Sequence, residues 1–313
     1  MTLLEITNLK VHFPVRTGRF GGNKDVLKAV DGVSLTVNAH ETLAVVGESG
    51  CGKSTTGNAV LGLAPVTAGK ITFEGSDLAK LNMSARRRVW REMQVVFQDP
   101  VSALNPRRTI MQSIAEPLVI HGFPKTQLNA RVEELMAFVG LNSDQKNRRP
   151  GALSGGQRQR VVIARAVALN PKLVICDEPV SALDVSIQSQ ILNLLMRLQR
   201  DLGLSYLFIA HDLSVVRHIA DRVAVMYLGL VVEEGATADV FENPIHPYTE
   251  ALLSSIPIPD PSMRNKRERI VLQGDLPSPL YPPEGCPFVT RCPIAEKECH
   301  SVRPQLTETS PKH

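Results

Sequence analysis

"GESGCGKST", residues 47–55, follows the apolar run "LAVV" at 43–46 and leads into the helical pattern "TTGNAVLGL". The spacing G-x-x-x-x-G-K-S between a strand and a helix is typical of a phosphate-binding loop. Its backbone N–H groups hold phosphates, its lysine reaches the β- and γ-phosphates, and its serine hydroxyl ligates Mg²⁺. We therefore expect a nucleotide site, with Ser54 on the metal, made of Gly47, Glu48, Ser49, Gly50, Cys51, Gly52, Lys53, Ser54 and Thr55.

Further apolar runs alternate with helical patterns along the chain. They are "QVVFQ" (94–98), "LVICDE" (173–178), "YLFIAH" (206–211) and "VAVMY" (223–227). Uninterrupted apolar strands separated by helices are typical of a parallel sheet covered on both faces. Alternating apolar and polar residues in "LLEITNLKVHF", "VDGVSLTVN" and "KITFEG" indicate antiparallel strands. The predicted fold is an α/β P-loop NTPase with an N-terminal antiparallel β-subdomain.

Two segments depart from this alternation. Between about 100 and 171, apolar residues recur at three- and four-residue spacing, which predicts a helical insertion. After about residue 256 the composition shifts, because half of the chain's 22 prolines lie between Pro257 and Pro311. We expect an ATPase domain over 1–255 and a loop-rich extension rich in proline and cysteine over 256–313.

Polar side chains follow three of the predicted core strands. Asp177 and Glu178 end the run "LVICDE", Gln98 ends "QVVFQ", and His211 ends "YLFIAH". The carboxyl ends of parallel strands line the ligand crevice of an open sheet. Asp177 is expected to hold Mg²⁺ and Glu178 to act as the base that polarises the attacking water. Gln98 and His211 are expected to contact the γ-phosphate or the water, with Gln98 also near the metal.

Composition narrows the classes of function. The chain of 313 residues is 43% hydrophobic, which is ample for a buried core, and its formal charge is only +4. The basic run Arg86 to Arg88 is interpreted as a solvated helix face, so no nucleic-acid partner is expected. A leader pattern and a bilayer-length apolar run are both lacking, which predicts a protein that is cytosolic by itself.

The ordered motifs resemble those of the ATP-binding-cassette ATPase family from Leu3 to about Leu253. Besides the phosphate loop and Gln98 they include "LSGGQ" (153–157), "SALD" (181–184) and "AHD" (210–212). The resemblance implies two such subunits packed head to tail, with ATP between the phosphate loop of one and the "LSGGQ" of the other. The residues that would meet the partner's nucleotide are Ser154, Gly155, Gly156 and Gln157. The family also suggests Phe13 as the aromatic that stacks on adenine, and Asp184 as a residue that communicates across the dimer.

A narrower resemblance comes from the long first loop, from "FQDPVSALNPRRT" and from the tail "NPIHPYTEALLSSIP" and "LPSPLYPPEGCPFVTRCP". These segments are similar to the oligopeptide/dipeptide importer ATPases, and the loop favours the second, F-type, of their two ATPases. The resemblance implies a second ATPase subunit, two transmembrane permeases and an extracytoplasmic substrate-binding protein. It also implies a peripheral position on the cytoplasmic face of the inner membrane.

Other functions remain open at this point. Nickel and glutathione importers share the C-terminal extension. A soluble cassette ATPase of translation or DNA repair is a different class, although this chain has one cassette and no long coiled-coil insertion. An ordinary P-loop kinase or GTPase would leave "LSGGQ" unexplained.

Three of the five cysteines, Cys286, Cys292 and Cys299, lie close together in the tail. They resemble the group that binds a 4Fe–4S cluster in some members of this family, with a fourth cysteine further on. Iron–sulfur clusters usually take four thiolates, and this sequence reaches His313 without the fourth. The alternatives are a truncated sequence, substitution by His300 or His313, or a reduced cysteine group without a cluster.

Overall fold

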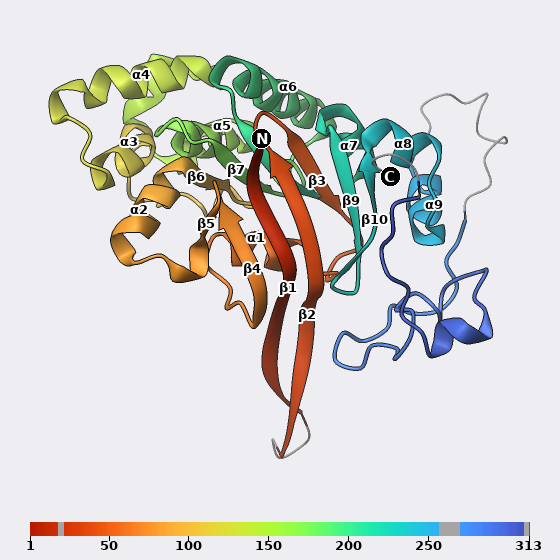
Figure 1. Cartoon of the computed structure of the whole chain (residues 1–313). Coiled ribbons are helices and arrows are strands. Elements are labelled where there is room, and N and C mark those ends of the chain that lie inside the picture. Colours follow the sequence, from red (N-terminus) through yellow and green to blue (C-terminus); the bar gives the residue numbers. More distant parts are fainter. Residues whose placement is uncertain (18–21, 257–269, 310–312) are drawn as a thin grey trace, which may run out of the picture. The chain divides into compact units, whose positions relative to one another are not determined.

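The computed structural model describes residues 1–17, 22–256, 270–309 and 313 (Figure 1). The chain divides into two compact units whose segments alternate along the sequence. Unit 1 comprises Met1–Leu3, Val37–Thr42 and Lys80–Phe208. Unit 2 comprises Leu4–Thr36, Leu43–Ala79 and Ile209–His313.

An antiparallel sheet forms the first part of unit 2, as the alternating pattern predicts. Its strand order is β2-β1-β4-β5, and β1 pairs with β4 from Leu4 opposite Phe73 to Lys10 opposite Ala68. Leu4 is buried while its neighbour Glu5 is exposed, so the alternation of the sequence becomes the two faces of the sheet. The strands are β1 (Thr2–Thr17), β2 (Asn23–Asn38), β4 (Ala68–Phe73) and β5 (Ser76–Asp77) (Figure 1).

A second set of strands in unit 2 has the order β10-β9-β3. Strand β3 (Thr42–Val46) runs parallel to β9 (Arg222–Tyr227), and β10 (Leu230–Ala236) returns antiparallel to β9. All five residues of β3 are buried, which explains its uninterrupted apolar pattern. The helices of unit 2 are α1 (Lys53–Val60), α7 (Leu213–Ile219), α8 (Thr237–Glu242), α9 (Pro247–Ser254) and the 3-10 turn η6 (Lys297–His300).

Unit 1 contains the remaining strands of the predicted parallel type, in the order β8-β7-β6. They are β6 (Met93–Val96), β7 (Leu173–Asp177) and β8 (Ser205–Ala210). Strands β6 and β7 are parallel, with Met93 opposite Leu173 and Val96 opposite Cys176. Together with β3 and β9, they confirm the predicted α/β class and each of the five predicted core strands.

The helices of unit 1 include the predicted insertion. Within 100–171 the structure has the α-helices α3 (Ile110–Ile120), α4 (Leu128–Phe138) and α5 (Gly155–Val167). The run Arg86 to Arg88 lies on α2 (Met83–Glu92), and α6 (Val185–Leu202) ends at Gly203, whose φ of 66° permits the left-handed C-cap. Short 3-10 turns connect them: η1 (Leu78–Lys80), η2 (Lys125–Gln127), η3 (Ser143–Asn147) and η4 (Pro150–Ala152).

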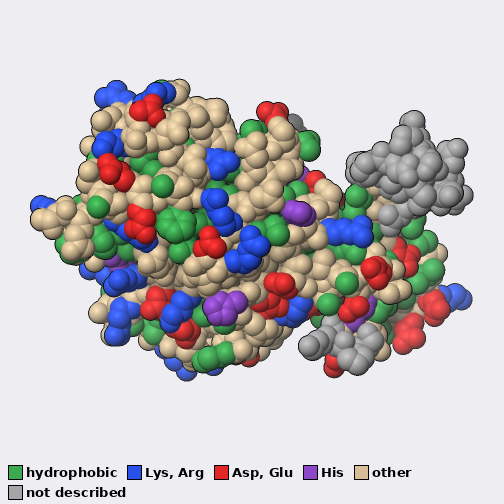
Figure 2. Space-filling model, turned by 90° about the horizontal axis from the view of Figure 1, so that it is seen from above, with side chains coloured by type: hydrophobic (Ala, Val, Ile, Leu, Met, Phe, Trp, Pro, Cys, Tyr) green, Lys and Arg blue, Asp and Glu red, His purple; other side chains and the backbone are tan. Residues whose placement is uncertain are grey.

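The surface carries both signs of charge. Figure 2 shows Lys and Arg side chains interspersed with Asp and Glu on the face drawn. Within the described ranges, every helix is too short or too polar to cross a membrane.

Candidate nucleotide site

The phosphate loop connects β3 to α1 within unit 2. Two of its glycines, Gly47 and Gly52, are required by close packing, because a Cβ on Gly47 would lie 2.1 Å from the carbonyl oxygen of Met226. A Cβ on Gly52 would lie 2.2 Å from the carbonyl oxygen of Ala29. Gly47, Gly50 and Gly52 also have φ values of 151°, 81° and 105°, which side chains disfavour. The predicted loop is therefore held tightly between the backbones of β2 and β9.

Lys53 opens α1 and is buried, with 5% of the residue exposed. Its ammonium group donates hydrogen bonds to the carbonyl oxygens of Gly47, at 2.7 Å, and Glu48, at 2.9 Å. The buried Cys51 thiol lies 3.8 Å from the same nitrogen. Burial raises the pKa of Cys51, and the nearby Lys53 charge opposes that rise in part. The loop thus places the buried Lys53 ammonium group at the N-terminus of a helix, the end whose dipole favours an anion.

Two residues that the sequence analysis did not single out contact the loop at Glu48. The Tyr248 hydroxyl accepts a hydrogen bond from the Glu48 N–H at 2.8 Å. Arg291 forms a two-pronged ion pair with the Glu48 carboxylate, at 2.8 and 3.1 Å. Their separations from Glu48 are 200 and 243 residues, so no local pattern could have revealed them.

The other predicted nucleotide contacts of unit 2 lie on two separate elements. Phe13 is half-buried on β1, which leaves part of its ring accessible. His211 is exposed directly after β8. The next residue, Asp212, caps α7 by accepting a hydrogen bond from the Ser214 N–H at 2.8 Å.

The predicted acidic group is in unit 1. Asp177 is the last residue of β7, and Glu178 follows with a φ of 46°, in the left-handed region. Extending the β6–β7 register by two residues from Val96 and Cys176 places Gln98 opposite Glu178. The Gln98 amide donates a hydrogen bond to the Glu178 carboxylate at 2.8 Å. Two of the predicted strand-end side chains therefore lie in contact.

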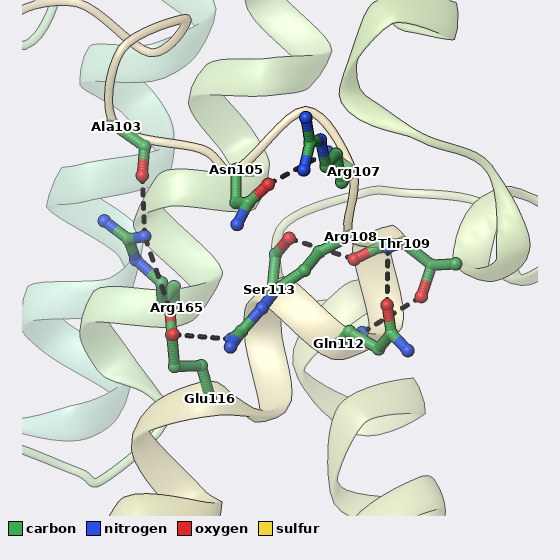
Figure 3. Close-up of polar contacts among 9 residues, drawn as sticks. All are labelled: Ala103, Asn105, Arg107, Arg108, Thr109, Gln112, Ser113, Glu116 and Arg165. Atoms are coloured by element: carbon green, nitrogen blue, oxygen red, sulfur yellow. Dashed lines mark hydrogen bonds and ion pairs between the residues drawn. The ribbon is translucent and has the colours of Figure 1, made fainter.

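The loop after Gln98 is tied to helix α5, as Figure 3 shows. Arg165 of α5 donates a hydrogen bond to the Ala103 carbonyl oxygen at 2.7 Å. Its guanidinium also lies 4.0 Å from Glu116, which pairs with Arg108 at 2.5 Å. Burial lowers the pKa of Arg165, and the Glu116 carboxylate opposes that shift. Helix α5, which begins within "LSGGQ", is thus bonded through Arg165 to the loop after Gln98.

The "LSGGQ" segment leads into the start of α5. Ser154 is the N-cap, and its hydroxyl oxygen accepts from the Gln157 N–H while the Gln157 side chain accepts from the Ser154 N–H, completing a capping box. A Cβ on Gly156 would lie 2.7 Å from the Ile187 side chain of α6. The segment is thus fixed against the start of α6, immediately after the exposed Asp184.

The tail cysteines are close to one another but do not form a ligand set. The Cys286 N–H donates to the Cys299 carbonyl oxygen at 2.8 Å, and burial raises the pKa of the Cys286 thiol, with smaller contributions from Cys292 and Cys299. Among the residues the structure describes, no three His, Cys, Asp or Glu side chains are placed to hold a metal ion. The His313 ring is engaged elsewhere, 2.8 Å from the Glu233 carboxylate. These contacts do not fit an iron–sulfur cluster, and we assign none.

Comparison with known proteins identifies the family. The model described as "ABC transporter" matches residues 30–181, and "Oligopeptide/dipeptide transporter, C-terminal region" matches residues 232–299. The oligopeptide transport ATP-binding protein AppF of Bacillus subtilis is 51% identical over 314 residues, covering 100% of this chain and 95% of AppF. The chain belongs to the ABC transporter family. The oligopeptide transport ATP-binding protein OppF of Salmonella typhimurium is 54% identical over 308 residues, covering 97% of this chain and 92% of OppF.

A solved structure supports the same ABC transporter fold. It is the dimeric post-hydrolysis state of the ATP-binding cassette MJ0796 bound to ADP and Pi, with a TM-score of 0.66 and 27% identity. The match covers 75% of this chain and 99% of that cassette. The matches to AppF and OppF cover 100% and 97% of this chain, so the family assignment extends through its C-terminal region.

Proposed function

We propose that this chain is the ATP-binding and ATP-hydrolysing subunit of a bacterial importer of di- or oligopeptides. The observation that carries the proposal is the joint match of the transporter model and of the peptide-transporter C-terminal region within one chain. Residues 1–255 are assigned to the ATPase domain, with its helical part at about 100–171, and residues 256–313 to the extension.

The unit 2 residues are proposed to bind the nucleotide. The loop amides and Lys53 hold its phosphates, Phe13 stacks on adenine, and His211 contacts the γ-phosphate. Mg²⁺ prefers oxygen ligands, and Ser54, Gln98 and Asp177 are the residues proposed to supply them. When bound, the metal neutralises charge on the phosphates.

The unit 1 residues are proposed to carry out hydrolysis and dimer closure. Glu178 accepts a proton from the attacking water, and its hydrogen bond from Gln98 orients the carboxylate. Ser154, Gly155, Gly156 and Gln157 meet the γ-phosphate held by a second ATPase subunit, with Asp184 communicating across the dimer. The helix N-terminus there supplies N–H groups to a phosphate that already has a lysine.

The assembly follows from this function. Two ATPase subunits close on two ATP molecules and reopen after hydrolysis, so ATP has different affinities for two states. Two transmembrane permeases receive that motion, and an extracytoplasmic binding protein delivers the peptide. The ATPase is placed peripherally on the cytoplasmic face of the cell membrane, and copurification of two permeases from detergent-solubilised membranes is expected.

Replacing Glu178 with Gln tests the catalytic assignment. Glutamine keeps an oxygen that accepts the Gln98 hydrogen bond, so we expect ATP binding and a stabilised closed dimer with turnover reduced by about 10²- to 10⁴-fold. The matched control is Glu134→Gln, because Glu134 is an exposed carboxylate on α4 of the same unit. Turnover of Glu178→Gln at the wild-type rate would remove Glu178 from the role of base.

A further inference from the structure

Arg291 connects the C-terminal extension directly to the phosphate loop within unit 2. Both prongs of its guanidinium are bonded to the Glu48 carboxylate, and only 10% of the Arg291 side chain is exposed, against 30% for Glu48. The hydrogen bonds to Glu48 are the main reason why the pKa of Arg291 is raised. Paired, charge-assisted bonds of this kind fix direction as well as distance. The contact therefore has a fixed geometry, unlike an ion pair between two exposed side chains.

The position of Arg291 is set by a buried aromatic cluster, defined as Tyr227, Tyr248 and Phe288. The Phe288 ring, 1% exposed, packs edge-on against Tyr227 with ring centroids 5.2 Å apart and lies 5.6 Å from Tyr248. The Arg291 N–H donates to the Phe288 carbonyl oxygen, and its guanidinium carbon lies 5.9 Å from the centre of the Tyr227 ring. The extension is thus anchored one turn before the residue that contacts the loop.

Glu48 connects Arg291 and Tyr248 to Lys53, the lysine proposed to bind phosphate. Its N–H donates to Tyr248, its carboxylate is held by Arg291, and its carbonyl oxygen accepts from the Lys53 ammonium. A shift of Glu48 would therefore move an acceptor of the Lys53 hydrogen bonds. Of these partners, Tyr248 belongs to the aromatic cluster and Arg291 to the extension.

The Glu48 carboxylate also acts on the loop through its charge. A carboxylate in a loop that cradles phosphates repels a polyphosphate unless a cation neutralises it. We propose that Arg291 is a positioning residue of the phosphate loop, which fixes and neutralises Glu48 and so sets the affinity of the loop for nucleoside triphosphates. The inference rests on the proposed nucleotide site and adds to it a role for the extension.

The test measures the Kd of the full-length protein for MgATP by isothermal titration calorimetry. Arg291→Gln exposes the Glu48 charge and should raise the Kd about tenfold, whereas Glu48→Gln leaves the Arg291 charge and should lower it about threefold. The double variant should return to within about twofold of the wild type. The increase caused by Arg291→Gln should shrink at 1 M salt, because screening weakens the repulsion. If Arg291 contributed to stability alone, Arg291→Gln would lower the melting temperature without these opposite and salt-dependent changes in Kd.

Arg303→Gln is the matched control, because Arg303 also belongs to the extension but pairs with Asp31 of β2, at 3.3 Å, and not with Glu48. Its Kd should equal that of the wild type. If the double variant has a Kd for MgATP as high as that of Arg291→Gln, Arg291 binds the nucleotide itself and the inference is overturned. A wild-type Kd in Arg291→Gln would exclude any role of Arg291 in nucleotide affinity and would also overturn it. If Arg291→Gln fails to fold, a Kd in Glu48→Gln that is unchanged or raised overturns it instead. Failure of the nucleotide site is distinct, since the wild type and Lys53→Ala would then bind MgATP equally.

Discussion

Replacing Gly156 with alanine should destabilise unit 1 by a specific collision. The new Cβ would lie 2.7 Å from Cγ2 of Ile187, a distance at which one of the two groups must move. Neither group is the far end of a flexible chain, because β-branched Ile187 lies in the first turn of α6 and Gly156 in the first turn of α5. The strain therefore falls on the packing of the two helix N-termini.

The size of the effect follows from two opposing contributions. Overpacking of this kind costs about 1–3 kcal/mol. Alanine in a helix is more favourable than glycine by up to about 1 kcal/mol, because it restricts the unfolded chain. We expect Gly156→Ala to lower the free energy of unfolding by about 1–2 kcal/mol.

The neighbouring glycine provides a matched control. A Cβ on Gly155 would lie 3.5 Å from the Leu183 side chain, an ordinary contact, so Gly155→Ala should leave the free energy of unfolding unchanged or raise it slightly. Urea titrations followed by circular dichroism measure both variants. Repeating Gly156→Ala in an Ile187→Ala background removes the colliding atom, and the alanine should then be neutral or stabilising. An equal loss in both backgrounds would refute the collision.

Three other perturbations separate packing, charge and assembly. Arg165→Met should lower the free energy of unfolding by about 1–3 kcal/mol, measured by urea titration, because it leaves the Ala103 carbonyl oxygen without its charged donor. Burial lowers the pKa of His246, whose neutral Nδ1 accepts from the Tyr248 N–H at 3.1 Å. The unfolded chain therefore binds the proton more readily, so the contribution of His246 to the free energy of unfolding is complete above pH about 6.5 and is lost as the pH drops below it. Between pH 7.5 and 5.5, the free energy of unfolding should fall less in His246→Asn than in the wild type. An equal fall in both proteins would exclude His246 as its source. Ser154→Arg should retain MgATP binding yet block ATP-dependent dimerisation in light scattering, and dimers at wild-type yield would contradict the shared site.

Local sequence was sufficient to predict those elements whose structure depends on the residue pattern of a single segment. The alternation in β1 and β4 predicts a sheet with one buried face, and the uninterrupted apolar run of β7 predicts a strand buried on both. The contact between Gln98 and Glu178 was predictable in kind, because the ends of parallel strands gather their polar residues. The capping box at Ser154 is likewise contained in four consecutive residues.

Contacts between distant segments were not predictable in this way. Strand β10 was missed, because its sequence "LVVEEGA" carries two adjacent glutamates where alternation was expected. The register of β9 and β10 shifts between Val231 and Glu233, and the buried Glu233 accepts from the N–H groups of Ile245 and His246. A buried carboxylate is tolerated there because a later turn and the His313 ring supply its partners.

The parallel pairing of β3 with β9 also governs the order in which the chain can fold. Leu43 lies opposite Arg222 and Val46 opposite Val225, so this part of the sheet cannot form until the ribosome has released most of the sequence. Such a high contact order slows folding. The unit 1 segment from Lys80 to Phe208 lies between the two strands in the sequence, so it leaves the ribosome before β9 does. A nascent chain that stops before β9 would leave the apolar run Leu43–Val46 of β3 without its pairing to that strand. Folding of unit 2 is therefore expected to be the late, chaperone-sensitive step of biosynthesis.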